Sequence, residues 1–509
     1  MDVLYHIKLG KARLKGENNF LYTLEYYILW CYNIDIILRA HGRGLMSFVE
    51  IGEMKKQNEY ISLVKSRVLG TNKKAFVYTL GCQQNEADSE KIAGMLVSMG
   101  YTMTENEQEA DILIVNTCAI REHAERRALS IIGRFKHYKA KNPDIIIGVC
   151  GCMTAQEHRR EHFKRSYHYV NFTFGTGALH RLPEFVYNAL AGGKRYFDID
   201  KTTPEIAEGL PSNRASTYRA WVSIMYGCNN FCTYCIVPYV RGRERSREKE
   251  DILNEIKDLV ARGYREITLL GQNVNSYGKD LVNKTSIAEL LEDISKIEGD
   301  FWLHLMTSHP KDASDEMIEA IKKSPRTSGH FHLPLQSGSD EILKRMNRHY
   351  DLSKYLSIID KLRDGNENIT LTTDIIVGFP GESEEDFKKT IDVINKVKYD
   401  SVFSFIYSPR KGTPAAEMEN QIPEEIKHRR YDEFCEAQNN ISKEINEKMV
   451  GTVVKALVDG KSKNNTLAYT ARTQGNKIVH FESDTDHTGH FVNIKITKAD
   501  TFNLFGELN

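Results

Sequence analysis

Short apolar runs alternate with helical patterns over residues 73 to about 150. The runs that predict buried strands are 74–80, 111–116 and 144–149. Between the first two, Ile92, Met95 and Leu96 recur at helical spacing and Gly100 follows as a stop signal. Strands that alternate with helices in this way predict an open parallel α/β domain over residues 73–191.

The same alternation is repeated about six times in the central part of the chain. The strands predicted there are 220–225, 266–270, 302–306, 330–335, 371–377 and 401–407. Ser286 with Glu289, and Ser383 with Asp386, fit the capping box that begins a helix. Six consecutive strand–helix units predict a partial (β/α)6 barrel over residues 214–444, with its chemistry at the carboxyl ends of the strands.

The pattern changes to short β runs from about Lys448. The runs are 452–458, 467–472, 477–481 and 491–498, separated by polar turns. They predict a small antiparallel β-barrel over residues 447–509, similar to oligonucleotide-binding barrels. The whole chain is therefore predicted to be of the α/β class, with a β-barrel at its end.

Two stretches carry no clear fold signal. Residues 192–213 contain prolines and mixed charge without periodicity, which predicts a linker. Residues 1–70 are left as an unassigned N-terminal extension. Within it, Glu25 and Asp35 interrupt the apolar stretch 20–38, so no membrane span is predicted.

Composition narrows the class of partner and compartment. The 69 basic residues balance the 69 acidic ones, so a nucleic-acid surface has to be a local patch. Nine cysteines in 509 residues are too sparse for a disulfide scaffold. No secretory signal is evident, and we expect a cytoplasmic protein, a monomer without a membrane partner.

Three cysteines at C-x3-C-x2-C spacing form the most informative motif. Cys228, Cys232 and Cys235 follow the first predicted strand of the barrel. Three thiolates can hold three irons of a cubane [4Fe–4S] cluster, which leaves the fourth iron free for a small molecule. Electron carriers use four cysteines, and four-thiolate zinc sites pair two C-x2-C elements, which this chain lacks.

A second set of three cysteines is predicted in the N-terminal domain. Cys82, Cys118 and Cys152 each follow a predicted strand, and the carboxyl ends of parallel strands share one edge. These residues are therefore predicted to hold a second [4Fe–4S] cluster. Cys150 lies inside the strand pattern and is predicted to pack in the core. Cys31 and Cys435 are isolated and predicted to be unligated.

These motifs resemble those of the methylthiotransferases, a family of radical S-adenosylmethionine enzymes. The resemblance covers about residues 73–509, and Tyr234 supplies the aromatic residue of the radical signature. The matching segments are 81–90, 116–118, 151–153, 226–239, 333–339, 346–348 and 374–382. Within the family the chain resembles the tRNA-modifying MiaB type. Gln84 stands where methionine is common there, and no effect on chemistry is expected.

The resemblance implies a reaction and its cofactors. It implies an N-terminal cluster domain, a radical core and a TRAM domain. The reaction that the resemblance implies would convert N6-isopentenyladenosine at tRNA position 37 to its 2-methylthio derivative. One S-adenosylmethionine would supply the radical and another the methyl group, while the N-terminal cluster would hold or deliver sulfur. An aromatic C–H offers nothing to acid–base catalysis, so a cofactor has to carry the step.

The resemblance also implies partners and contacts. The partners are the tRNA anticodon stem-loop and a low-potential electron donor, flavodoxin or ferredoxin-like. The predicted S-adenosylmethionine contacts are Tyr234, Gln272, Asn273, Ser308, Gln336, Ser337, Arg345 and Glu382, with Lys344 and Arg348 as further candidates. His309 and His332 receive no role. Arg241, Arg243, Arg245 and Arg247 are candidate RNA contacts, and a solvated or core-pairing stretch is an equally open interpretation.

Two other functions stay open at this point. A sibling methylthiotransferase would act on threonylcarbamoyladenosine in tRNA or on an aspartate of a ribosomal protein. A non-enzymatic iron–sulfur carrier or tRNA-binding scaffold belongs to a different class, and the absence of a fourth cysteine in each set argues against a carrier.

Overall fold

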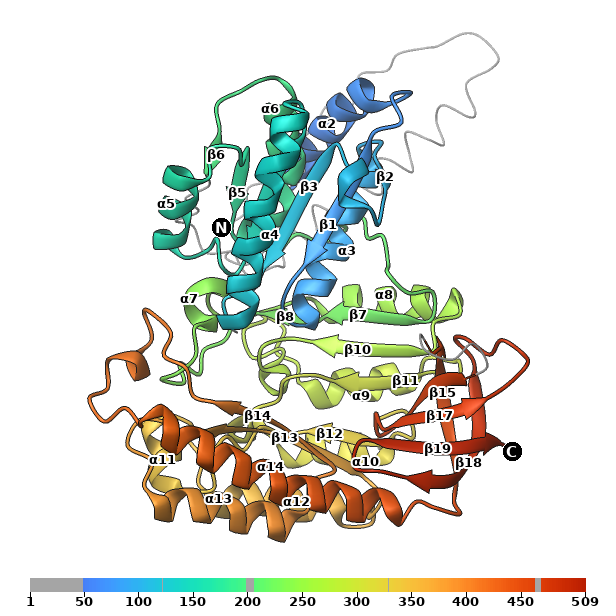
Figure 1. The fold of residues 1–509 in the computed structure, drawn as a ribbon. Coiled ribbons are helices and arrows are strands. Elements are labelled where there is room, and N and C mark those ends of the chain that lie inside the picture. The colour runs from blue at the N-terminus through green and yellow to red at the C-terminus, as the bar shows by residue number, and fades with distance from the viewer. Residues whose placement is uncertain (1–48, 121, 198–205, 328, 463–467) are drawn as a thin grey trace, which may run out of the picture. The chain divides into compact units, whose positions relative to one another are not determined.

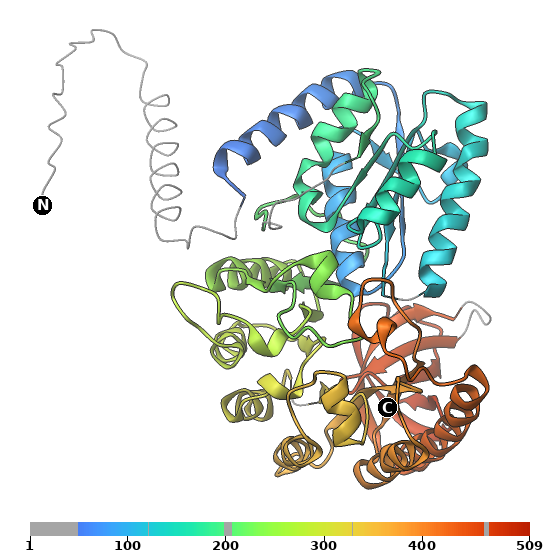
Figure 2. The same cartoon turned by 90° about the vertical axis from the view of Figure 1, so that its left-hand side faces the viewer.

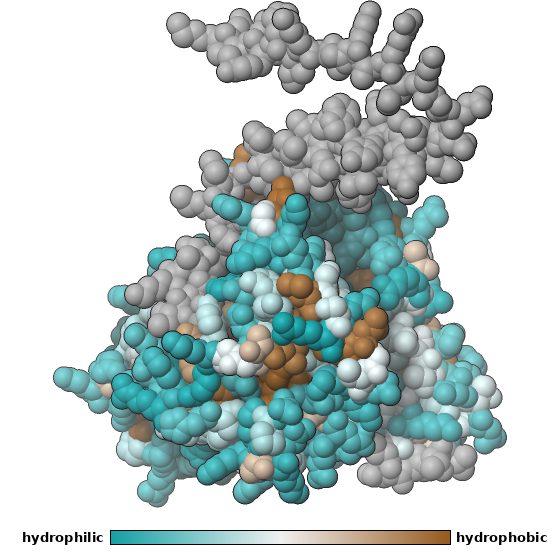
Figure 3. Space-filling view, turned by 90° about the horizontal axis from the view of Figure 1, so that it is seen from above, coloured by the Kyte–Doolittle hydropathy of each residue, from teal (hydrophilic) through white to brown (hydrophobic). Residues whose placement is uncertain are grey.

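A computed structural model describes residues 49–120, 122–197, 206–327, 329–462 and 468–509 (Figure 1). Cys31 and the apolar stretch 20–38 lie outside these residues. Among the described helices, none has the length and apolarity needed to cross a bilayer. The face shown in Figure 3 is mostly hydrophilic, and its apolar side chains form small patches.

The N-terminal domain is an open parallel sheet with helices on both faces, as predicted. Its described strands run in the order β2-β1-β3-β4-β5-β6, and every pair is parallel. They are β1 (Lys74–Thr79), β2 (Thr102–Met103), β3 (Ile112–Thr117), β4 (Ile146–Gly151), β5 (Phe172–Phe174) and β6 (Tyr196–Phe197). The helices are α2 (Ile51–Val68), α3 (Gln83–Ser98), α4 (Glu122–Lys141), α5 (Glu157–Ser166) and α6 (Leu182–Leu190).

Two apolar clusters cover the two faces of this sheet. One cluster takes side chains from α2, α3 and α6, and the other takes them from α4 and α5. The strands β3 and β4 are buried along their whole length, which explains why they were recognisable as continuous apolar runs.

Two segments differ from the prediction. Part of the unassigned extension forms α2, whose Val64 and Val68 are buried in the domain core one helical turn apart. Residues 196–197 of the predicted linker form the edge strand β6, which pairs with β5. A strand of two residues is too short to leave a periodic signal in the sequence.

The central domain carries six parallel strands in chain order, divided into two sheets. The sheets are β11-β10-β7 and β12-β13-β14. The strands are β7 (Arg219–Ser223), β10 (Glu266–Leu270), β11 (Trp302–Leu305), β12 (His330–His332), β13 (Thr370–Val377) and β14 (Ser401–Ile406). Between the two sheets, the Leu303 N–H of β11 donates to the carbonyl of Arg326, which precedes β12, at 3.0 Å.

The helices of the central domain cover the outside of these strands in an arc (Figure 2). They are α8 (Lys249–Ala261), α9 (Ile287–Ser295), α10 (Asp315–Lys323), α11 (Asp340–Arg345), α12 (Leu352–Arg363), α13 (Glu384–Val397) and α14 (Glu424–Glu447). Ser383 and Asp386 form the complete capping box that was predicted. At α9, Ser286 caps the helix, while the Glu289 carboxylate accepts from Thr285 instead.

The C-terminal domain is a closed barrel with strand order β15-β16-β17-β19-β18 in its described residues. The strands are β15 (Val453–Lys461), β16 (Ala468–Thr473), β17 (Ile478–Glu482), β18 (Phe491–Ala499) and β19 (Asn503–Leu508). The prediction missed β19, which pairs parallel with β17, so the expected wholly antiparallel barrel is wrong at that pair. Gly506 interrupts the sequence pattern typical of a strand. Glycine is required at this position because a Cβ would lie 2.4 Å from the Lys495 carbonyl oxygen.

The barrel contacts the amino ends of the central strands. Arg219, the first residue of β7, pairs with Asp459 at 2.8 Å. Trp302, the first residue of β11, packs on Phe491 with ring centroids 4.6 Å apart. The opposite, carboxyl edge of the central strands is therefore left for the functional site. In Figure 1 the barrel lies at the right-hand end of these strands, and the N-terminal domain lies above β7.

A close backbone contact generates the first prediction. The end of the predicted linker lies against α3, where a Cβ on Gly94 would be 2.2 Å from the Pro211 carbonyl oxygen. We expect Gly94→Ala to lower the free energy of unfolding by about 1–3 kcal/mol, the usual cost of overpacking. The measurement is urea denaturation of the cluster-free chain.

Gly133 in α4 provides the matched control. No heavy atom lies within 4 Å of its Cβ position, so Gly133→Ala should stabilise the chain by about 0.4–1 kcal/mol. Equal denaturation midpoints for the two variants would contradict the close contact at α3.

Candidate iron–sulfur and cofactor site

The loop that carries Cys228, Cys232 and Cys235 lies at the carboxyl end of β7. It begins after β8 (Met225–Tyr226) and leads into the short helix α7 (Val237–Arg241) and β9 (Arg245–Ser246). The pairing of β8 with β9 closes the loop at its base. Gly227 has φ +76°, and a Cβ there would lie 2.0 Å from the Arg243 carbonyl oxygen, so only glycine fits.

Residues distant in sequence hold the backbone of this loop. The Lys311 ammonium donates to Asn230 Oδ1 at 2.7 Å, and the Thr233 N–H donates to the Met346 carbonyl at 3.0 Å. Phe231 adopts a left-handed φ of +48°, which is unfavourable for a bulky residue. The Asn347 side chain donates to the Phe231 carbonyl at 3.0 Å and so stabilises this conformation.

The three thiols of the loop lie beside a buried positive charge. Burial raises the pKa of Cys228 and of Cys235 to about 12. The Arg348 guanidinium donates to Cys232 Sγ at 3.3 Å and to the Pro334 carbonyl at 3.1 Å. Thiols that resist ionisation in this way become thiolates when they bind a metal centre.

The second set of thiols comes together at the carboxyl edge of the N-terminal sheet. Cys82 is the N-cap of α3, and the N–H of Cys152 donates to the Thr117 carbonyl at 2.9 Å. A Cβ on Gly81 would lie 3.1 Å from the Cβ of Cys118, so these turns are in contact. Burial raises the pKa of Cys152 to about 12, with Arg241 acting to lower it and Cys118 and Cys82 acting to raise it.

Both sets fit an iron–sulfur cluster in their donor chemistry. Across the described residues, no three His, Cys, Asp or Glu side chains could share one metal ion. A cubane cluster does not require that, because each thiolate binds a separate iron. Hydrogen bonds to the sulfurs, from the Ile120 N–H to Cys118 and from Arg348 to Cys232, are typical of the surroundings of such clusters.

The other cysteines have different surroundings. Cys150 lies on β4 and belongs to the apolar cluster of α2, α3 and α6, and burial raises its pKa well above the usual value. Cys152 belongs to a separate small cluster on α7. Cys435 is half-buried, with its sulfur 3.9 Å from the Ser404 hydroxyl.

The helix α7 brings the two thiol sets next to each other. Cys152 packs with Ile236 and Val240, and Ile236 directly follows Cys235 of the loop. The Thr176 hydroxyl donates to the Val240 carbonyl at 2.8 Å, a further bond between the domains. The two predicted sites therefore share one wall.

The predicted S-adenosylmethionine contacts lie along the carboxyl rim of the central strands. Gln272 Oε1 accepts from the Gly227 N–H at 2.5 Å, directly beside the loop. The Tyr234 ring packs edge-on against Phe379 with centroids 6.5 Å apart. Arg345 lies over the 378–382 turn, since a Cβ on Gly381 would be 1.8 Å from its guanidinium.

Several of these residues are used by the protein itself. Glu382 accepts from the Gly378 N–H at 2.9 Å and pairs with Arg430 at 2.8 Å, while burial raises its pKa to about 7. Ser308 donates to the His332 carbonyl, and Ser337 accepts from the Ser339 N–H at 3.3 Å. Glu382 in particular braces the turn at the rim.

Unpaired polar atoms mark where a ligand could bind. Asn273 donates to Asp312 at 2.8 Å, but its Oδ1 is buried without a hydrogen-bond partner. Asn230 Nδ2 in the loop and His309 Nε2 are in the same situation. Gln336 has φ +72°, and its N–H bonds to the Asp374 carbonyl. The assignment of the eight rim residues to S-adenosylmethionine stays a prediction.

Sequence reasoning missed two contributors to the loop. Lys311 lies outside the sequence motifs. Asn347 lies in the matching segment 346–348, which by itself indicates no role for this residue. Both act on the backbone and the Asn230 side chain of the loop, from positions 81 to 117 residues away in sequence. Only the folded rim brings them there.

Three of the four candidate RNA-binding arginines are inside the protein. Arg241, Arg245 and Arg247 are only 3%, 6% and 6% exposed. Arg247 pairs with Glu208 at 2.6 Å and Glu255 at 2.7 Å. The RNA-contact prediction is therefore wrong for these three, because the core-pairing interpretation describes them. Arg243 alone is exposed, with its guanidinium 4.3 Å from the Phe231 ring centroid.

Comparison with known proteins agrees with this geometry. Residues 222–394 match the radical SAM superfamily, residues 74–175 match the uncharacterized protein family UPF0004, and residues 447–508 match the TRAM domain. The radical S-adenosylmethionine methyltransferase TsrM from Kitasatospora setae has the same fold over 68% of this chain and 77% of its own, with TM-score 0.50 and 13% identity. The chain is thus of the radical S-adenosylmethionine class of enzymes.

Curated relatives identify the family. A tRNA-2-methylthio-N(6)-dimethylallyladenosine synthase from Clostridioides difficile is 50% identical over 467 residues, covering 90% of this chain and 98% of the relative. The enzyme of the same name from Acetivibrio thermocellus is 48% identical, covering 91% and 97%. The chain belongs to the tRNA-2-methylthio-N(6)-dimethylallyladenosine synthase family, which confirms the methylthiotransferase resemblance.

Two neighbouring cysteines provide a test of the N-terminal thiol set. We expect Cys150→Ala to leave the iron content unchanged, because its sulfur packs in the domain core. Cys152→Ala should remove one ligand of the set and lower the iron content. The measurement is iron per chain after anaerobic reconstitution. Equal iron loss in both variants would mean that Cys150 is also a ligand.

Proposed function

We propose that this chain converts N6-isopentenyladenosine at position 37 of tRNA to 2-methylthio-N6-isopentenyladenosine, with two [4Fe–4S] clusters and S-adenosylmethionine. One observation carries the proposal: Cys152 of one cysteine set packs against α7, and Cys235 of the other set lies directly before that helix, so the two sets of three cysteines share one wall. The names of relatives that share about half of the sequence support the choice of substrate.

The two thiol sets fit two different roles. When bound, a three-thiolate cluster with S-adenosylmethionine supplies the radical chemistry that an unactivated aromatic C–H requires. Around Cys228, Cys232 and Cys235, the chain contributes a hydrogen bond from Asn347 to the loop backbone and a buried cation, Arg348. The set on Cys82, Cys118 and Cys152 is the proposed place from which sulfur is transferred.

An exposed aromatic and basic surface next to the loop fits an anticodon loop. Tyr239 is 51% exposed, and its ring stands edge-on to Phe231 at 6.0 Å. Arg243 lies over the other aromatic ring of this pair. Single-stranded bases stack on aromatic rings and on guanidinium planes, and phosphates bind arginine. We name these three residues the Phe231–Tyr239–Arg243 surface.

The remaining parts of the proposal concern partners. A low-potential donor of the flavodoxin or ferredoxin class would reduce the clusters, and a monomer in the reducing cytoplasm would suffice. Reaction on threonylcarbamoyladenosine or on a ribosomal-protein aspartate would give a different product mass. The reconstituted chain, assayed with each substrate by mass spectrometry, distinguishes these functions, and no cleavage of S-adenosylmethionine at all would favour a carrier or scaffold.

Cys118→Ala separates the two proposed roles. We expect this variant to cleave S-adenosylmethionine, because the loop between β8 and α7 is intact. It should form less than about 1% of the thiomethylated nucleoside that the unsubstituted chain forms, since residues that act as a unit lose function together. The Cys232→Ala variant is the control and should lose both activities. Normal thiomethylated product from Cys118→Ala would refute sulfur transfer at the N-terminal set.

Arg243→Glu tests the RNA surface. We expect weaker binding of an anticodon stem-loop at low salt and a salt-dependence slope reduced by about one, as for loss of one phosphate contact. Fluorescence anisotropy at several salt concentrations measures both. Arg262→Glu is a matched control, because Arg262 is also exposed and also lies over an aromatic ring, that of Tyr264, at 5.6 Å from its centroid. Equal effects of the two variants would contradict the assigned surface.

A further inference from the structure

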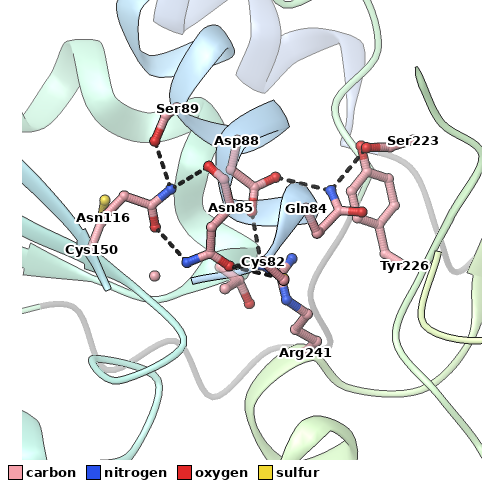
Figure 4. A network of polar contacts seen from close by, with 12 residues as sticks. Cys82, Gln84, Asn85, Asp88, Ser89, Asn116, Cys150, Ser223, Tyr226 and Arg241 are labelled. Carbon is pink, nitrogen blue, oxygen red and sulfur yellow. Dashed lines mark hydrogen bonds and ion pairs between the residues drawn. The ribbon is translucent and has the colours of Figure 1, made fainter. Parts of the chain in front are cut away.

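The Arg241 side chain connects the two cluster-bearing domains through buried polar contacts. Its Nη2 donates to Asp88 Oδ2 at 3.0 Å and to Asn85 Oδ1 at 2.9 Å. Both acceptors are on α3, the helix whose N-cap is Cys82, while Arg241 ends α7, the helix that follows Cys235. Figure 4 shows Arg241 reaching from α7 toward these two side chains.

The acceptors of Arg241 are themselves fixed in place. Asn85 donates to the Leu80 carbonyl at 3.0 Å and to the Thr117 carbonyl at 2.9 Å, so it joins the turns that precede Cys82 and Cys118. Cys82 Sγ lies 3.6 Å from Asn85 Oδ1, the same oxygen that Arg241 binds. The guanidinium is therefore one side chain away from a predicted cluster ligand.

A second contact between the domains starts from Asp88. Its Oδ1 accepts from Gln84 Nε2 at 3.2 Å, and the same nitrogen donates to the Ser223 hydroxyl on β7 at 2.8 Å. Gln84, which sequence comparison suggested was a neutral departure from the family pattern, is thus part of the junction (Figure 4). The network makes the position of Arg241 well defined relative to the N-terminal thiols.

The charges around the N-terminal thiols are unequal. Arg241 and Asp88 form a buried pair, with side chains 4% and 10% exposed. The Arg241 charge also acts on Cys152 and Cys82, while Arg410 is close enough to interact with Cys118 and also with Glu122 and Glu125. Asp88 already pairs with Arg241, so the three thiolates carry more negative charge than Arg241 can offset. Reduction adds one more electron at this site, and net charge near a cluster tunes its potential.

We propose that Arg241 is a positioning residue that raises the reduction potential of the N-terminal cluster, relative to the cluster on the Cys228–Cys235 loop. This inference rests on the proposed function, because it requires a cluster on Cys82, Cys118 and Cys152. The positive charge at the shared wall favours the reduced form on the N-terminal side. The cluster on the loop has its own cation, Arg348, which donates to Cys232.

The experiment measures each cluster separately in the full-length chain. In the triple variant with Cys228, Cys232 and Cys235 replaced by alanine, only the N-terminal cluster is reconstituted. In this background we expect Arg241→Met to make the cluster about tenfold harder to reduce at a fixed potential. For a one-electron couple that is a shift of about 59 mV to more negative potential. Redox titration followed by electron paramagnetic resonance provides the midpoint.

Two matched variants separate charge from packing. Arg241→Lys keeps the charge and should stay close to the unsubstituted midpoint, even where its hydrogen bonds are weaker. Arg348→Met should leave the N-terminal midpoint unchanged. In the reciprocal background, with Cys82, Cys118 and Cys152 replaced by alanine, Arg348→Met should shift the remaining cluster and Arg241→Met should not.

These experiments distinguish failure of the Arg241 inference from failure of the proposed function. If the first background binds no iron, the second cluster is absent and the proposed function fails. If iron binds but Arg241→Met leaves the midpoint unchanged, or Arg241→Lys shifts it as far as Arg241→Met does, the role of the Arg241 charge is overturned. An equal shift of both clusters by Arg241→Met would indicate a general loosening of the junction and would also overturn it.

Discussion

The contact between two parallel-sheet edges is the constraint on which the rest of this structure depends. The N-terminal sheet presents Cys82, Cys118 and Cys152 at the carboxyl ends of its strands, and the central strands present their cluster loop at the same kind of edge. Parallel strands place all their carboxyl ends on one side, so each edge collects residues that are far apart in sequence. The helix α7 lies between the two edges and belongs to the packing of both.

Buried polar groups cross this junction beside the small apolar cluster at α7. A buried ion pair is costly unless both charges are well bonded, and loss of one partner leaves an uncompensated charge. The pair of Arg241 and Asp88 is bonded further through Asn85 and Gln84, so both charges have polar partners at the junction. The same buried guanidinium that holds the domains together is close enough to act on the thiols.

The C-terminal barrel lies at the end of the central strands that carries no predicted functional site. It contacts the first residues of β7 and β11 and covers the amino end of the central strands, opposite the cysteine loop. A direct role for this barrel in RNA binding would therefore involve surfaces away from the cluster loop. The Phe231–Tyr239–Arg243 surface, in contrast, lies on the loop itself.

The sequence by itself determined the fold class, the order of domains and the two thiol sets. Buried strands such as β3 and β4 leave continuous apolar runs, and cysteines after such parallel strands are expected at one edge. Short elements such as β6, and β19 with its inner glycine, left no periodic signal. Only the tertiary structure decided which arginines are exposed, because Arg243 and Arg245 are alike in sequence but differ in what surrounds them. The tertiary structure also decided that one network joins Gln84, Asp88, Ser223 and Arg241. The bonds of this network that cross between the domains join residues more than 130 positions apart, and no local sequence pattern records such contacts.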